Sequence, residues 1–238
     1  MDGKSFAENE MIIALGVTLS FEKVVLGAIE SSTENGKVCR DFLLQLQERG
    51  LKSEEKILFV IDGAKGLRKG IQTVFGKQGI IQRCQWHKRE NVVAYLPKIE
   101  QSRFRKKLQK AYEAPSYSQA KQKLSAIRKE LQLINESAVN SLDEGLEETL
   151  SLHRLGLFEQ WGISLKTTNC IESLNSQLEQ YTKRVSYWKN SNQRQRWVAT
   201  ALLAIEPSLR KIKGFKFLPM LKNNMNNFDQ DRNQSKAA

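Results

Sequence analysis

The sequence predicts an α/β fold in which a mixed β-sheet, covered by helices on both faces, is interrupted by a large all-helical insertion. Two observations support this prediction. Apolar runs of strand length alternate with segments of helical periodicity over residues 1–87. After residue 87 the strand signals stop, and segments of helical periodicity or propensity follow one another. We therefore expect a first part of the core, a helical insertion, the closing helices of the core and a polar, disordered tail, at residues 1–96, 97–160, 161–212 and 213–238.

The N-terminal part of the core begins with two runs rich in β-forming residues, 11–19 and 23–31. A connection of hairpin length separates them, so we expect an antiparallel pair. A cap signal at 33–35 then precedes apolar residues at helical spacing, and Gly50 follows them. We expect the first helix between these two signals.

The stretch 57–87 forms the centre of the predicted core. Its wholly apolar run at 57–61 ends on Asp62 and a glycine, which is typical of a strand buried on both faces. Apolar residues then recur on one helix face from Leu67 onward, and a second apolar run follows at 79–84. This order predicts a strand, a helix and a second strand.

Polar residues with chemical potential follow both of these strands. In open α/β sheets ligands collect at the carboxyl ends of strands, which singles out Asp62, Cys84 and His87. For Asp62 the alternative is a cap on the following helix. Cys84 and His87 have the spacing of metal ligands but make only half of a structural zinc site. A buried pair that packs, a pair that tunes a neighbouring site and a Cys/His nucleophile remain as alternatives.

The rest of the chain is predicted to be helical. Four segments of the insertion have helical character, at 91–96, 101–112, 117–135 and 137–155. Another helix, at 169–181, carries Asn169, Glu172 and Asn175 at intervals of three beside its apolar stripe. For Glu172 the alternative is a solvated helix face. A last helix is expected at about 192–205.

Composition and charge narrow the class of protein. The chain has 238 residues, is 40% apolar and carries a formal charge of +12, which favours a globular protein with a phosphate-rich partner. Eight Lys and Arg lie within 88–110. Four Trp are interspersed with basic residues, although each is more often core than a base-stacking platform. The absence of a long apolar run or a signal-like start, with three scattered cysteines, predicts a cytoplasmic, nucleoid-associated protein without a membrane partner.

Several segments together resemble the catalytic domain of bacterial Mutator-type transposases, in the same order. They read MDGKSFAENEMIIALGVT, STEN, VIDGAKGLRKGI, QRCQWHKRENVVAYLPK, DEGLEETLSLHRLG and KTTNCIESLN. The resemblance extends to about Ile212 and implies an RNase H-like fold. It places the helical insertion between the fifth strand and the helix with the acidic residue. Family members continue upstream with a first strand, so we expect the core to lack that strand here.

The resemblance also implies a site. The family's two aspartates fall on Asp2 and Asp62, and its glutamate falls on Glu172, between Asn169 and Asn175. This trio would hold Mg²⁺ or Mn²⁺ for phosphodiester cleavage and strand transfer. The family's Cys/Asp-x-x-His motif falls on Cys84 and His87, which would shape or polarise the site, with His87 acting in catalysis.

The implied partners are double-stranded DNA, as transposon ends and target, and a second transposase chain, by self-association or by pairing with a full-length transposase. An alternative is a remnant that binds DNA or full-length transposase without cleaving. The cations expected to contact DNA are Lys65, Arg68, Lys88, Arg89, Arg103, Arg105, Lys106, Lys107, Lys166, Lys183 and Arg184.

Overall fold

The structure is a computed structural model, and it describes residues 1–6, 9–18, 20, 22–31, 35–52, 54–185 and 187–234. Two compact units can be distinguished by the density of their internal packing. The first, here called the sheet unit, comprises Met1–Ile57, Ala64–Gly79 and Thr168–Pro219. The second, the helical unit, comprises Leu58–Gly63, Ile80–Thr167 and Met220–Ala238.

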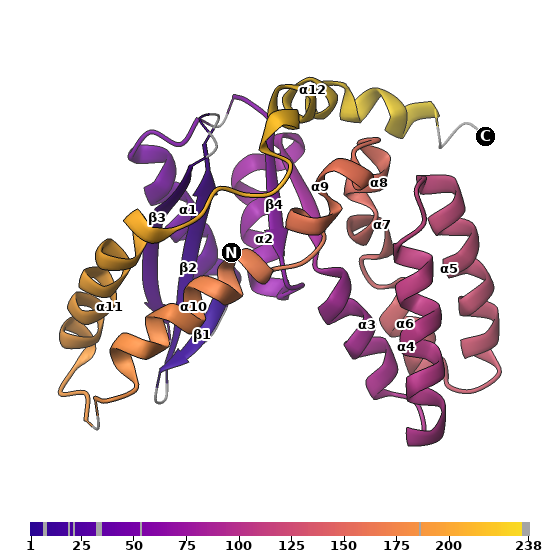
Figure 1. The fold of residues 1–238 in the computed structure, drawn as a ribbon, viewed down its shortest axis with the longest axis horizontal. Helices are drawn as coiled ribbons and strands as arrows, with labels where there is room; N and C mark the ends of the chain where they lie inside the picture. Colours follow the sequence, from indigo (N-terminus) through magenta and orange to yellow (C-terminus); the bar gives the residue numbers. More distant parts are fainter. Residues whose placement is uncertain are drawn as a thin grey trace. The chain divides into compact units, whose positions relative to one another are not determined.

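The sheet unit contains three antiparallel strands in the order β1-β2-β3 (Figure 1). They are β1 (Asp2–Phe6), β2 (Asn9–Val17) and β3 (Lys23–Ser31). The predicted antiparallel pair of β2 and β3 is confirmed, with a shift of register between Ala14 and Leu15. Strand β1 was not predicted. It starts at Asp2, which lies opposite Ile13 of β2.

Helices cover both faces of this three-stranded sheet. On one face, α10 (Asn169–Thr182) and α11 (Ser191–Ile205) share an apolar core with β2 and with Ala28 of β3. Successive residues of a strand point to opposite faces. A Cβ on the neighbouring Gly27 would accordingly lie 3.2 Å from Phe42 of α1 (Gly36–Glu48). The prediction of helices on both faces is therefore confirmed for this sheet.

Two further elements of the sheet unit pack closely on each other. Asn35 caps α1, because its Oδ1 accepts hydrogen bonds from the backbone N–H groups of Lys37 and Val38. The next helix, α2 (Lys65–Phe75), approaches α1 at Gly70, where a Cβ would lie 2.9 Å from the Cβ of Cys39. The short 3₁₀ segments of this unit are η1 (Gly76–Gln78), η2 (Glu206–Ser208) and η3 (Phe215–Phe217).

The helical unit begins with a two-stranded sheet of β4 (Ile57–Ile61) and β5 (Gly79–Arg83). Both strands were predicted. The prediction of a single mixed sheet was not met, because the described strands are hydrogen-bonded in two separate sheets. In β4 only Phe59 and Ile61 are buried, so this strand is not buried along its whole length.

Helices make up the rest of this unit. Their bounds are α3 (Gln85–Ala94), α4 (Lys98–Tyr112), α5 (Tyr117–Gln132), α6 (Glu136–Asp143), α7 (Leu146–Thr149), α8 (Ser151–Arg154), α9 (Phe158–Leu165) and α12 (Leu218–Gln234). The first four surround an apolar core that includes Val92, Phe104 and Leu124. The segment 137–155 was expected to be one helix. It is interrupted at Gly145, whose φ of +66° an α-helix does not accommodate.

The C-terminal segment differs from the expectation of a disordered tail. It forms α12, in which Leu218, Leu221 and Phe228 are buried. The guanidinium carbon of Arg154 lies 4.5 Å from the centre of the Phe228 ring. The expectation of disorder rested on the polar composition of the segment. It did not take into account that a few apolar residues of a helix are enough to pack it against a neighbouring surface.

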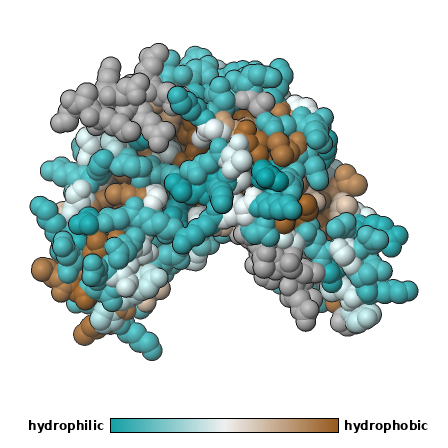
Figure 2. All heavy atoms as spheres, turned by 180° about the vertical axis from the view of Figure 1, so that it is seen from behind, coloured by the Kyte–Doolittle hydropathy of each residue, from teal (hydrophilic) through white to brown (hydrophobic). Residues whose placement is uncertain are grey.

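Some apolar side chains of the helical unit stay exposed. Tyr95, Ile99, Leu133 and Ile134 lie where α3 meets α4 and where α5 meets α6. Asn135 joins these two connections by donating from Nδ2 to the carbonyl of Tyr95 over 3.0 Å. Figure 2 shows hydrophobic atoms at this end of the helices, at the lower left. Among the residues that the structure describes, no helix has the length and apolar character needed to cross a bilayer.

Candidate functional site

The structure brings the ends of β4 and β5 together. The N–H of Cys84, just after β5, donates to the carbonyl of Ile61 over 2.7 Å, and Asp62 is the next residue. Asp62 is half-buried, whereas Cys84 is fully buried. The juxtaposition of Asp62 and Cys84 expected from the sequence is therefore found within the helical unit.

The local structure tests some alternatives for these residues. The N-cap position of α2 is occupied by Ala64, so the interpretation of Asp62 as the N-cap residue is wrong. Cys84 is the N-cap residue of α3, and its side chain makes no capping hydrogen bond. His87 lies in the first turn of α3, half-buried, with its ring centre 4.9 Å from that of Trp86 in an edge-on arrangement.

A buried arginine lies directly beside the turn that follows Asp62. Gly63 has a φ of +115°, and a Cβ on it would lie 2.7 Å from both Cζ and Nη2 of Arg83. On another side, a Cβ on Gly145 would lie 2.7 Å from Nη1 of Arg83. The guanidinium thus fits between two glycines, and any larger residue at either position would displace it.

The positive charge of Arg83 is directed at the start of α7. Its Nη1 donates to the carbonyl of Glu144 over 3.1 Å, and its Nη2 lies 3.5 Å from the Glu144 carboxylate. Nε of Arg83 is buried and makes no hydrogen bond with any residue in the described part of the chain. Arg83 therefore joins the end of β5 to the loop between α6 and α7.

Further buried polar groups extend this connection, which we call the polar seam. It consists of Gln82, Arg83, Gln85 and Lys88, which contact residues 144–152. Nε2 of Gln82 and Nε2 of Gln85 donate to the same carbonyl, that of Thr149, over 3.0 and 2.8 Å. Oε1 of Gln82 accepts from the N–H of Leu152 over 2.9 Å. Such hydrogen bonds satisfy groups whose burial would otherwise be costly.

Lys88 belongs to the polar seam and not to a DNA-facing surface. It is completely buried, and its Nζ donates to the Glu144 carbonyl. Burial, followed by the nearby charge of Arg83, lowers the pKa of Lys88 to about 8. The prediction that Lys88 contacts DNA is corrected by this position, since a phosphate cannot reach a side chain without accessible surface.

Glu172 occupies the first turn of α10 in the sheet unit. Oγ1 of Thr168 donates to its Oε1 over 2.6 Å, and the N–H of Glu172 donates back to the carbonyl of Thr168 over 3.0 Å. Glu172 is half-buried, so it is not on a fully solvated face. Asn169 is exposed and Asn175 is buried on the same helix.

Asp2 is placed through its backbone only, because its side chain lies outside the described part. Its strand partner Ile13 packs in the same apolar core as Ile171 and Leu174, the neighbours of Glu172. Asp2 and Glu172 thus belong to the sheet unit, and Asp62 belongs to the helical unit. Among the described side chains, no group of three or more His, Cys, Asp and Glu is arranged to hold a metal ion.

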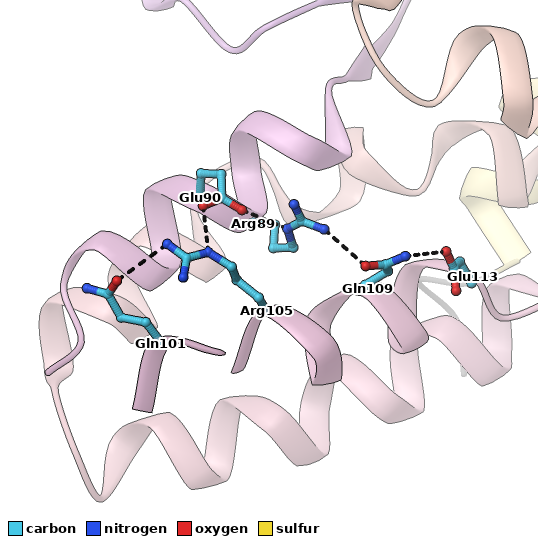
Figure 3. A network of polar contacts seen from close by, with 6 residues as sticks. All are labelled: Arg89, Glu90, Gln101, Arg105, Gln109 and Glu113. Atoms are coloured by element: carbon cyan, nitrogen blue, oxygen red, sulfur yellow. Dashed lines mark hydrogen bonds and ion pairs between the residues drawn. The ribbon is translucent and has the colours of Figure 1, made fainter. Parts of the chain in front are cut away.

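Four of the eight cations in the predicted basic cluster pair with acidic residues, and Figure 3 shows the part of this network around Glu90. Glu90 accepts from Nε of Arg89 over 2.9 Å and from Nε of Arg105 over 2.8 Å. On the other side of α4, Arg103 and Lys107 both pair with Glu130 of α5. These cations therefore hold helices to one another as well as contributing positive charge.

The other cations expected to contact DNA are distributed over several elements. Lys65 and Arg68 are exposed on α2, and Lys106 is exposed on α4. Lys166 is half-buried, with its Nζ 5.9 Å from the centre of the Phe158 ring. Lys183 and Arg184, which follow α10, are exposed.

Sequence reasoning missed Arg83, Gln82 and Gln85. A signal was present, since Gln82 and Arg83 are polar residues within the short apolar run that predicts β5. A polar residue in a buried strand requires a hydrogen-bonding partner. The partners could not be inferred, because they lie more than 60 residues later in the chain.

Comparison with known protein families identifies the family of this chain. Residues 2–207 match the family described as Transposase, Mutator family. The chain belongs to the Mutator family of transposases. The matched segment includes all three acidic positions, 2, 62 and 172, as well as Cys84 and His87.

Curated relatives of this Mutator-family chain are transposases of insertion sequences. It is 27% identical over 193 residues to the transposase for insertion sequence element IS256 in transposon Tn4001 of Staphylococcus aureus, covering 80% of this chain and 48% of the relative. It is 28% identical to the transposases for IST2 of Acidithiobacillus ferrooxidans and IS905 of Lactococcus lactis, covering 73% and 85% of this chain and 57% and 51% of those relatives. The chain spans about half the length of these relatives.

Proposed function

We propose that this chain is the catalytic part of a DNA transposase and performs metal-dependent cleavage and strand transfer on transposon DNA. The observation that carries the proposal is the family match over residues 2–207, which includes Asp2, Asp62 and Glu172. An Asp-Asp-Glu triad of this kind would need an RNase H-like arrangement, in which strand ends and a helix face converge. The two-faced helical cover of β1–β3 supports that arrangement.

The chemistry of the three side chains fits Mg²⁺, or Mn²⁺ in its place. Carboxylate oxygens are the ligands that these hard cations prefer. Asp62 and Glu172 are both half-buried, which leaves each carboxylate partly accessible. Asp2, Asp62 and Glu172 would hold the metal ions, which when bound activate the attacking oxygen and stabilise the leaving oxygen of the phosphodiester.

Residues of this chain would keep the carboxylates in position. The hydroxyl of Thr168 donates to Oε1 of Glu172 and so restricts the rotation of that carboxylate. Arg83 restrains the backbone of Gly63, directly after Asp62. Cys84 and His87 lie at the same strand ends as Asp62, where His87 is accessible enough to contact substrate.

The test measures cleavage and binding separately. Asp62→Asn and Glu172→Gln remove a charge while preserving shape, and Glu179→Gln is the matched control on the exposed face of α10. We expect Mg²⁺-dependent nicking of transposon-end DNA to fall at least about 100-fold in the first two variants. The control should cleave as the unmodified chain does, and all of them should bind DNA in EDTA.

Two results would contradict this function. If Asp62→Asn cleaves at the unmodified rate, the triad is wrong. If the unmodified chain binds transposon-end DNA but does not cleave it with Mg²⁺ or Mn²⁺, its role is binding to DNA or to a full-length transposase. Size-exclusion chromatography of the chain with a full-length relative would then measure the second kind of binding.

A further inference from the structure

Positive charge is concentrated in a part of the sheet unit that follows α10. Residues 183–216 contain nine Lys and Arg and a single acidic residue, Glu206. Oε2 of Glu206 accepts a hydrogen bond from the N–H of Val25 on β3 over 2.5 Å. The one carboxylate of this segment is therefore directed at the sheet and not at the neighbouring cations.

The cations around the α10–α11 connection differ from those of α3 and α4. Lys183, Arg184, Lys189 and Arg196 are exposed, and among the described residues none of them has an acidic side chain within ion-pair distance. On α3 and α4, by contrast, Arg89, Arg103, Arg105 and Lys107 all pair with glutamates. The α10–α11 connection thus carries four exposed cations that have no acidic partner among the described residues, whereas four of the eight cations at 88–110 are paired.

Exposed aromatic rings lie among these cations. Tyr187 is 75% exposed and Trp197 is 45% exposed. The ring of Trp197 meets Trp188 edge-on, with centres 6.3 Å apart, and Trp188 packs against the core formed by β2, α10 and α11. Trp197 is therefore held against Trp188 while much of its ring stays accessible.

Hydrogen bonds fix the two ends of this connection. The N–H of Val185 donates to the carbonyl of Thr182 over 3.0 Å, continuing from the end of α10. At the start of α11, Oδ1 of Asn190 accepts from the N–H of Gln193 over 2.9 Å. In return, Oε1 of Gln193 accepts from the N–H of Lys189 over 2.7 Å. Such reciprocal capping orients the side chains on either side of it.

We propose that this surface binds DNA that carries unpaired bases beside a duplex, using cations for phosphates and aromatic rings for bases. We name it the basic-aromatic surface, formed by Lys183, Arg184, Tyr187, Lys189, Arg196 and Trp197. Lysine and arginine bind phosphates by releasing counterions. Aromatic rings stack on bases without regard to sequence, but only on bases that are not stacked in a duplex. A transposon end supplies such bases when one strand has been cut and the cut strand separates from its complement beside the nick, so the inference rests on the proposed function.

The first experiment tests the cations. The double variant Lys183→Gln/Lys189→Gln is compared with Lys123→Gln/Lys129→Gln, a matched pair of exposed lysines on α5 that are also six residues apart. The probe is a DNA duplex with a single-stranded overhang, and affinity is measured by fluorescence anisotropy in EDTA at several salt concentrations. We expect about tenfold weaker binding for the first variant and a slope of log affinity against log salt shallower by about 1.5, because each lost phosphate contact contributes about 0.7 to 0.9. The α5 variant should change little.

The second experiment tests the aromatic contact. Tyr187→Ala removes a ring that is mostly in solvent, so folding is not at risk, and Tyr187→Phe keeps the ring. Tyr187→Ala should bind the overhang duplex about tenfold more weakly and a blunt duplex unchanged. Tyr187→Phe should restore binding to the overhang.

Several outcomes would overturn the inference. Equal losses for both lysine pairs would mean general electrostatic attraction, and equal losses of Tyr187→Ala on blunt and overhang DNA would exclude base stacking. Unchanged DNA binding with loss of a protein partner would make the surface a protein interface. All binding is measured without metal, so these results can be interpreted even if the chain does not cleave DNA. The Asp62→Asn variant should bind DNA like the unmodified chain.

Discussion

Arg83 lies across the α-carbon of Gly63, so closely that a methyl group there would lie 2.7 Å from its guanidinium carbon. Gly63 directly follows Asp62, and Arg83 directly precedes Cys84. The contact therefore links the two strand ends that carry the candidate residues. Because Arg83 also bonds to the Glu144 carbonyl, the same side chain connects them to the helices that follow Gly145.

Replacing this glycine should be costly. We expect Gly63→Ala to lower the free energy of unfolding by about 3 kcal/mol. There are two causes: alanine poorly adopts the φ of +115° at this position, and its Cβ would displace the buried Arg83. Gly76→Ala is the matched control, since its φ is +50° and no atom lies within 4 Å of its added Cβ. It should cost only about 1 kcal/mol. Urea unfolding measures the free energy of unfolding of both variants. Equal losses would show that displacement of Arg83 does not contribute to the cost.

Burial of Lys88 should make stability depend on alkaline pH. Its pKa is lowered to about 8 in the folded state from 10.5, so between these values the unfolded chain binds more protons. Stability due to this group therefore rises as the pH increases from about 8 to 10.5, by at most about 3 kcal/mol. Lys88→Met should remove that rise, and Lys106→Met, on an exposed lysine, should retain it. Unfolding curves at pH 7.5 and 10 compare the variants.

His153 should destabilise the protein in acid. Its ring is buried, stacks on Phe158 with centres 3.7 Å apart, and its Nε2–H donates to the Ala114 carbonyl. Burial lowers the pKa of His153 to about 4 from 6.5, despite the opposing effect of that carbonyl.

The unfolded chain thus takes up a proton on this histidine first, and stability is lost as the pH falls from 6.5 toward 4, by up to about 3 kcal/mol. Thermal unfolding from pH 7 to 4 should show a flatter loss for His153→Gln. His87→Gln, on the half-buried histidine, should keep the steep loss. The same profile in all three chains would contradict the assignment.

The ion-pair network of α3 and α4 should add modest stability. Burial opposes ionisation of Glu90, but hydrogen bonds from Arg105 and Arg89 outweigh it and lower the pKa of Glu90. Its contribution is present above about pH 4.5 and is lost as the pH falls below that value. Glu90→Gln should cost about 1 kcal/mol at pH 7. A double-mutant cycle with Arg105→Gln should give a favourable coupling free energy between Glu90 and Arg105. A coupling free energy of zero would show that this ion pair does not contribute to stability.

Thr168 should matter for catalysis more than for binding. Thr168→Val removes the hydroxyl that donates to Oε1 of Glu172 while keeping the shape of the side chain. We expect Mg²⁺-dependent cleavage to fall about tenfold, with DNA affinity in EDTA unchanged. Thr168→Ser, which restores a hydroxyl, should recover most of the rate. A rate for Thr168→Val equal to that of the unmodified chain would exclude an orienting role.

The sequence by itself determined most elements of this protein. The Asn35 cap, the apolar stripe of α2 and the 23–31 strand were predicted because capping, helical periodicity and β-propensity are local properties. The same local signals placed Asp62 and Cys84 at two strand ends, and the hydrogen bond between Cys84 and Ile61 confirms that these ends meet. The pairing of strands into two sheets was not predicted, since hydrogen bonding between distant strands has no local signal.

Only the tertiary structure decided what the charged residues do. Lys88 and Arg105 belong to one basic cluster in the sequence, yet Lys88 is buried against Glu144 and Arg105 is paired with Glu90. Lys183 was predicted to contact DNA and Lys189 was not, yet both are exposed. The reason is physical: the free energy of a charge depends on its burial and on its nearest opposite charge. Both are set by residues that are distant in the chain and adjacent only after folding.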